Sequence, residues 1–177
     1  MRTLPPVKGA LVAAACALAL LPAGAAQAGS GPAPAPGADR GATAMNAAPE
    51  SDAAEGSAQQ ARVCADAYQI GSTGHIKRKG HVIASVKQFY SPRCNRNYGY
   101  LYVWQSFRQK HPHWSTNIAV YDFKTHKLVG LRSWNRTKAA SFWSYPADTV
   151  RHCTAARGVV RAPGDSKQNF AYSSKRC

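Results

Sequence analysis

Glutamate is absent from the C-terminal two-thirds of this 177-residue chain, because Glu50 and Glu55, its two glutamates, both lie before residue 63. From Cys64 onward, four aspartates face nineteen lysines and arginines, a formal charge of +15. Chemistry that rests on a glutamate acid or base therefore has no residue to use in this part. A positive charge of this size instead attracts anionic polymers or acidic protein faces.

Recognisable catalytic motifs are also missing: the chain has no P-loop, no G-x-S-x-G, no H-E-x-x-H and no dinucleotide fingerprint. The pair His111 and His113 has no cysteine or carboxylate beside it, so we predict no metal and no cofactor. A small basic nuclease remains an alternative, but no spacing selects a catalytic pair among the histidines His75, His81, His126 and His152. We therefore predict a binding protein and not an enzyme.

Long apolar runs are scarce, since the longest, Ala10–Leu21, is shorter than the roughly 20 residues that span a bilayer. Arg2 and Lys8 precede this run, and the small-x-small sequence Ala26-Gln27-Ala28 follows it. Residues 1–28 are therefore predicted to be a secretory signal peptide, and the product to be secreted without a membrane span.

Residues 29–62 have no aromatic residue and no sustained apolar period, and are rich in proline and alanine. Such a segment buries too little surface to offset its ordering entropy, so we predict a disordered arm. The arm is either a spacer or a tail that orders on binding a partner.

Four cysteines follow the predicted cleavage site: Cys64, Cys94, Cys153 and Cys177. An even number in a secreted chain indicates disulfides, with three possible connectivities. We favour Cys64–Cys94 and Cys153–Cys177, because neighbours in sequence close the shorter loops.

Period-two alternation dominates residues 63–177, and it predicts an all-β domain: an antiparallel sandwich or small barrel stapled by disulfides. The expected strands cover residues 81–90, 98–107, 117–123, 128–134, 140–145, 158–161 and 168–173. Residues 124–127 form the expected hairpin turn. A short helical turn at residues 147–156 is the one helical alternative.

The order of cysteines and aromatic strands in residues 63–177 resembles a known family. Tyr68 follows Cys64, an apolar strand ends just before Cys94, and Tyr145-Pro146 precedes Cys153. This arrangement resembles the small secreted actinobacterial proteins of the spore-associated protein A family. The resemblance implies a β-rich extracellular domain and assigns no catalytic residue.

Two groups of residues are candidate binding sites. Lys77, Arg78 and Lys79 form the densest positive run, and we expect either a solvated loop or a contact patch for an anionic partner. The second group shares one face of a predicted strand, and it is either an aromatic platform or sandwich core. Its members are Tyr98, Tyr100, Tyr102 and Trp104.

From these features we predict an adaptor that engages a secreted protein partner. The resemblance to small secreted actinobacterial proteins implies as its setting an extracellular assembly such as an umbrella-type toxin particle. The alternative partner is an anionic or carbohydrate polymer of the cell envelope, and nucleic acid is a less favoured one.

Overall fold

The computed structural model of the protein describes Ala58 and residues 60–177. The predicted signal peptide, and the predicted arm up to residue 57, lie outside the described residues. Within the described part, eight strands and one short helix, α2 (Gln105–Arg108), follow one another. The strands are β1 (Tyr68–Arg78), β2 (His81–Ser91), β3 (Arg96–Val103), β4 (Trp114–Asp122), β5 (Lys127–Thr137), β6 (Ser141–Trp143), β7 (Thr154–Arg161) and β8 (Asn169–Tyr172). No helix in this part is long and apolar enough to cross a membrane.

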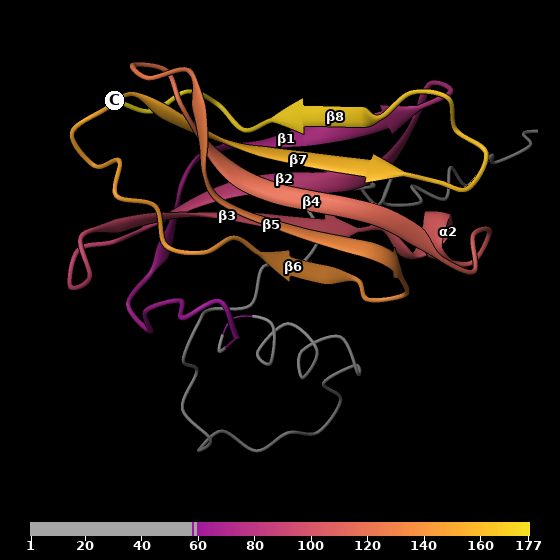
Figure 1. Cartoon of the computed structure of the whole chain (residues 1–177), viewed down its shortest axis with the longest axis horizontal. Helices are drawn as coiled ribbons and strands as arrows, with labels where there is room; N and C mark the ends of the chain where they lie inside the picture. The colour runs from indigo at the N-terminus through magenta and orange to yellow at the C-terminus, as the bar shows by residue number, and fades with distance from the viewer. Residues whose placement is uncertain (1–57, 59) are drawn as a thin grey trace, which may run out of the picture.

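The strands form two antiparallel four-stranded sheets, which confirms the predicted all-β class. Sheet A has the order β1-β2-β3-β6 and sheet B the order β5-β4-β7-β8, and the two lie face to face (Figure 1). Hydrogen bonds also join the sheets at both edges. The Ser174 amide donates to the Ser72 carbonyl at 3.1 Å, and the Tyr145 amide donates to the Gly130 carbonyl at 2.8 Å.

Alternating apolar residues of both sheets fill the space between them. Val86 and Leu101 of sheet A and Ile118 of sheet B belong to this core, and all three are fully buried. Two glycines let the layers approach. A Cβ added at Gly158 would lie 2.7 Å from Val86 Cγ2, and one at Gly99 would lie 2.9 Å from the Ala119 carbonyl oxygen. Any larger residue at these positions would push the sheets apart.

A second apolar cluster covers the other face of sheet A. Tyr98, Tyr100 and Tyr102 of β3 are buried there, at no more than 5% exposure. Ala58 and Ala61, from the segment before β1, belong to the same cluster. Consequently the tyrosines are core and not an open platform. The folded unit also begins before residue 63, because the end of the predicted arm packs against it.

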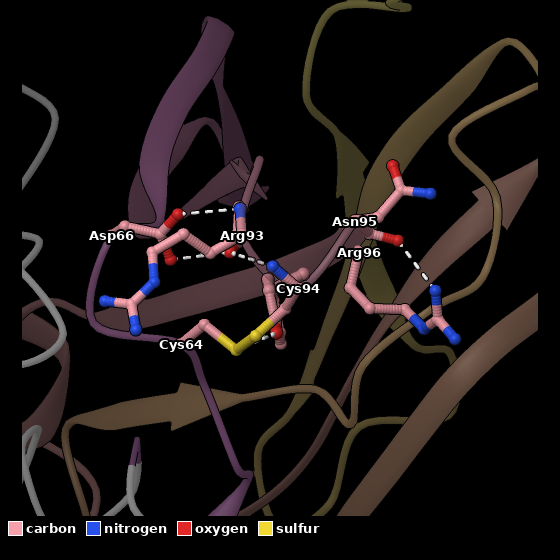
Figure 2. The surroundings of a disulfide bond; sticks show 8 residues. Cys64, Asp66, Arg93, Cys94, Asn95 and Arg96 are labelled. Carbon is pink, nitrogen blue, oxygen red and sulfur yellow. Dashed lines mark hydrogen bonds between the residues drawn. A yellow bond between two sulfur atoms is a disulfide. The ribbon is translucent and has the colours of Figure 1, made fainter.

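Both disulfides pair as expected. Cys64 bonds to Cys94, 30 residues later, and Cys153 bonds to Cys177, 24 residues later. Closing loops of this size stabilises the fold by about 3.5 kcal/mol each, through the reduced entropy of the unfolded chain. Beside the first bridge, Asp66 accepts a 2.9 Å hydrogen bond from the Arg93 amide (Figure 2). The two bridges indicate folding in an oxidising compartment.

Three local predictions were wrong. The strand expected to run to Phe107 ends at Val103, and α2 instead turns Phe107 into the core. The helical alternative at residues 147–156 fails because Thr154–Arg161 is the buried strand β7. No strand was predicted at residues 68–78, and a solvated loop or contact patch was expected at residues 77–79; residues 68–78 form β1, which pairs with β2.

Candidate binding surface

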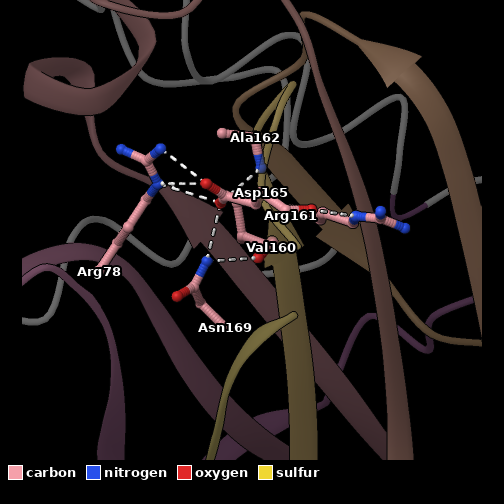
Figure 3. Close-up of polar contacts among 6 residues, drawn as sticks. All are labelled: Arg78, Val160, Arg161, Ala162, Asp165 and Asn169. Atoms are coloured by element: carbon pink, nitrogen blue, oxygen red, sulfur yellow. Dashed lines mark hydrogen bonds and ion pairs between the residues drawn. The ribbon is translucent and has the colours of Figure 1, made fainter. Parts of the chain in front are cut away.

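The predicted basic run lies at the β1–β2 hairpin. Lys77 and Arg78 are the last residues of β1, and Lys79 occupies the turn. Lys77 and Lys79 are exposed, whereas Arg78 is directed to Asp165 in the loop between β7 and β8 (Figure 3). The Arg78 guanidinium donates through Nε and Nη2 to both carboxylate oxygens, at 2.7–3.1 Å. Arg78 is therefore an anchor of the fold and not part of an open contact patch.

Asp165 gathers further donors around the same carboxylate. The Ala162 amide donates to it at 3.2 Å and the Asn169 side-chain amide at 3.1 Å. The bonds from Arg78, above all, lower the pKa of Asp165, although burial acts in the opposite direction. The carboxylate is thus fully engaged within the protein, and it fixes the β7–β8 loop against the β1–β2 hairpin.

The four aromatic residues predicted as a site do not form an open surface. Tyr98, Tyr100 and Tyr102 are buried, as described above, and Trp104 is partly buried, with its Nε1 donating to Ser85 Oγ at 3.0 Å. The Tyr100 ring lies 4.8 Å from the Trp143 ring, centroid to centroid. Their role in this structure is to build the second apolar cluster.

A different set of aromatic residues is exposed, on the outer face of sheet B. Phe170 and Tyr172 of β8 are 55% and 39% exposed. Ring contacts continue from Tyr172 to Tyr121 at 5.6 Å, and from Tyr121 to Phe123 at 5.0 Å. These four residues, called the aromatic stripe below, cross from the edge strand β8 to the end of β4.

Cationic side chains flank the aromatic stripe. The Arg157 guanidinium lies 5.3 Å from the Phe170 ring centre and 6.0 Å from that of Tyr172. The Lys175 ammonium lies 4.8 Å from the Phe123 ring centre. Cations placed over aromatic faces keep their charge while their stems and the rings form one continuous surface. Leu128, which pairs with Tyr121 across the β4–β5 hairpin, adds an exposed apolar side chain.

The sequence held a signal for the aromatic stripe that the prediction did not use. Residues 168–173 were expected to be a strand, and Phe170 and Tyr172 are two apart, so both project from one face. Their proximity to Tyr121 and Phe123 could not be predicted in the same way, because it depends on β7 lying between β4 and β8.

A hydrogen-bonded pair of side chains lies near the second disulfide. His152 Nδ1 donates to Asp122 at 2.7 Å, and the Lys124 amide donates to the same carboxylate at 2.8 Å. Burial acts to raise the pKa of Asp122, but the hydrogen bonds from His152, Lys124 and Thr125 bring it down to about 2. His152 is therefore bound into the structure. Nowhere in the described residues do three His, Cys, Asp or Glu side chains come together as a metal site.

Comparisons of the chain with family models, with curated proteins and with solved structures returned no match.

Proposed function

We propose that the protein is a secreted, non-enzymatic adaptor that binds an acidic protein partner through the aromatic stripe. The observation that carries this proposal is the exposure of Phe170 and Tyr172 beside Arg157 on a regular sheet face. Aromatic residues and arginine are enriched at protein interfaces and supply most of their binding energy. A contiguous exposed apolar patch on a folded domain marks an interaction site, whereas single exposed residues do not.

The charge of the domain supports an acidic partner. The nineteen cations and four aspartates after residue 63 leave a large positive excess. Two of those aspartates, Asp122 and Asp165, are engaged by His152 and Arg78. A positive field of this size raises the association rate with an acidic surface and disfavours basic partners.

The resemblance to the spore-associated protein A family is consistent with an extracellular setting, and an assembly such as an umbrella-type toxin particle is the setting we propose. Residues 29–57 would then add a second contact, in which an arm orders against the partner. Linking two contacts raises the affinity beyond that of either one.

A cell-envelope polymer is the second candidate partner, and the exposed Lys77 and Lys79 favour it. Binding of that kind is mainly electrostatic, so moderate salt would abolish it.

The test is affinity capture with the mature protein, from culture supernatant and from a cell-wall fraction. Three baits are compared: wild type, the double variant Phe170→Ser/Tyr172→Ser, and Tyr68→Ser as the matched control. Tyr68 is 53% exposed and belongs to β1 of sheet A, outside the aromatic stripe.

The proposal predicts one acidic protein, identified by mass spectrometry, that is retained by wild type and by Tyr68→Ser. The stripe variant should bind that purified protein at least tenfold more weakly, about 1.4 kcal/mol. Equal retention by all three baits would contradict the proposed surface. Retention by wall polymer alone, lost in moderate salt, would favour the envelope function.

A further inference from the structure

A cleft of about 610 Å³ opens on sheet B, beside the aromatic stripe and separate from it. Its floor is the outward side of β4, β5 and β7, where Asn117 is paired in register with both Ser133 and Val159. One wall is the loop after β7, with Gly164 and Gln168. The volume falls within the range of roughly 300–1,000 Å³ that is usual for small-ligand sites.

One polar group of the cleft lining has no hydrogen-bond partner. Asn117 Oδ1, on the outward face of β4, accepts no bond, although the atom is buried. An unpaired buried polar group costs roughly 1–3 kcal/mol, and native structures rarely leave one without a reason. An acceptor left open in the lining fits a ligand that donates a hydrogen bond, as a hydroxyl group does.

The cleft is also cationic. Arg136 and Arg161 line it and are exposed, and no aspartate or glutamate is among the lining residues. Arg161 is held by its Nε, which donates to the Asp165 carbonyl at 3.0 Å. Figure 3 shows the terminal nitrogens of Arg161 directed away from the Asp165 carboxylate, which faces Arg78 and Asn169. The negative charge nearest the cleft is thus already engaged.

Arg136 lies at an irregularity of the β4–β5 ladder, where the register shifts between Trp114 and Thr116. Its φ of 51° lies in the left-handed region, as occurs at β-bulges. Bulges redirect side chains and are frequent next to functional sites. Here the bulge carries one of the two guanidinium groups of the cleft.

We propose that this cleft binds an anionic carbohydrate, that is, a sugar or polyol unit that carries a phosphate or carboxylate group. Arg136 and Arg161 hold the charged group through charge-assisted hydrogen bonds. Asn117 Oδ1 accepts a hydrogen bond from a hydroxyl group of the sugar. This site goes beyond the proposed protein-binding function and does not depend on it.

The test is an NMR titration of the ¹⁵N-labelled mature protein with four probes: glucose 6-phosphate, glucuronate, glucose and inorganic phosphate. Saturable shifts of the Asn117 side-chain resonances are expected with the two charged sugars. The ratio of the Kd values for glucose 6-phosphate and glucuronate shows whether phosphate or carboxylate is preferred. Glucose and inorganic phosphate should each bind at least fivefold more weakly, because each offers only half of the recognised chemistry.

Variants locate the site. Arg136→Gln should raise the Kd for the charged sugars at least fivefold, and Arg151→Gln, an exposed arginine outside the cleft lining, should change it less than twofold. Asn117→Ala should weaken binding of the charged sugars but not of inorganic phosphate. The stripe variant Phe170→Ser/Tyr172→Ser should still bind the charged sugars, and Arg136→Gln should still bind the protein partner.

Two outcomes would overturn the proposal. Inorganic phosphate that binds as tightly as glucose 6-phosphate would show charge attraction without sugar recognition. No saturable shift with either charged sugar, in a protein whose spectrum shows that it is folded, would show that the cleft holds no such ligand.

Discussion

The hydrogen bonds that Asp122 accepts give the folded state a dependence on acid that can be worked out from the structure. Asp122 is 2% exposed and accepts hydrogen bonds from His152, Lys124 and Thr125. These bonds hold its pKa at about 2, against the ordinary value of 3.8. Because the folded-state pKa is lower than that of the unfolded chain, the stabilisation is complete above the unfolded value and is lost as the pH falls toward 2.

A difference of this size corresponds to about 2 kcal/mol, most of which should disappear between about pH 5 and pH 2. The variant Asp122→Asn has no carboxylate to protonate, so this part of its pH dependence should be absent. Its stability should be lower than that of wild type near pH 5, and the gap should narrow by about 2 kcal/mol on acidification. Urea unfolding, followed by tryptophan fluorescence across this pH range, measures the gap directly.

Asp148→Asn is the matched control, because the Asp148 side chain is 76% exposed and its contact with Arg96 is long, at 3.4 Å. That variant should follow wild type in parallel at every pH. Asp66 and Asp165 also have lowered pKa values, but they contribute equally to wild type and to Asp122→Asn and cancel in the comparison. A wild-type curve parallel to that of Asp122→Asn would refute the reasoning, because the carboxylate would then have the same pKa in both states.

Two further predictions concern the arm and the basic hairpin. Deleting residues 29–57 should leave the thermal stability of the domain nearly unchanged, because Ala58 and Ala61, which pack on sheet A, are retained. The same deletion should raise the Kd of the partner complex at least tenfold, about 1.4 kcal/mol, as measured by calorimetry. Equal affinity would make the arm a tether. Lys77→Gln/Lys79→Gln should flatten the salt dependence of binding to an anionic polymer while keeping the unfolding midpoint, whereas Arg78→Gln should lower the midpoint by stripping Asp165 of its main partner. An unchanged salt slope in the lysine variant, or an unchanged midpoint in Arg78→Gln, would contradict these roles.

Much of the fold could be read locally. Alternation in residues 81–90 and 117–123 predicted β2 and β4, since side-chain direction in a strand depends only on the order of residues. β1 was missed because its glycines, Gly71 and Gly74, resemble loop punctuation. Gly71 lies against the segment that follows β8, and Gly74 lies against the last residue of β8, so a Cβ at either glycine would clash with that part of the chain. The close contact is between residues about a hundred positions apart, so no local pattern could indicate it.

The candidate sites were harder to predict than the strands. The alternation in β3 placed Tyr98, Tyr100 and Tyr102 on one face, which the structure confirms. It could not say whether that face was covered. The run Lys77, Arg78 and Lys79 looked like one cationic patch. However, Arg78, the central residue, forms an ion pair with Asp165, 87 residues later. The two arginines of the cleft, Arg136 and Arg161, belong to different strands, β5 and β7, and no sequence motif identifies either of them.

By itself, then, the sequence determined the all-β class and the sign and size of the charge, which follow from composition and from neighbours along the chain. It favoured one of three cysteine pairings, and the structure confirms that one. Only the tertiary structure decided which aromatic residues are exposed, which cations are engaged and where a cleft opens. Those properties depend on the strand order, which places β7 between β4 and β8, and on the packing of Ala58 and Ala61 against sheet A. Strand order is set by the packing of whole faces against one another, and a period of two specifies a face without specifying its neighbour.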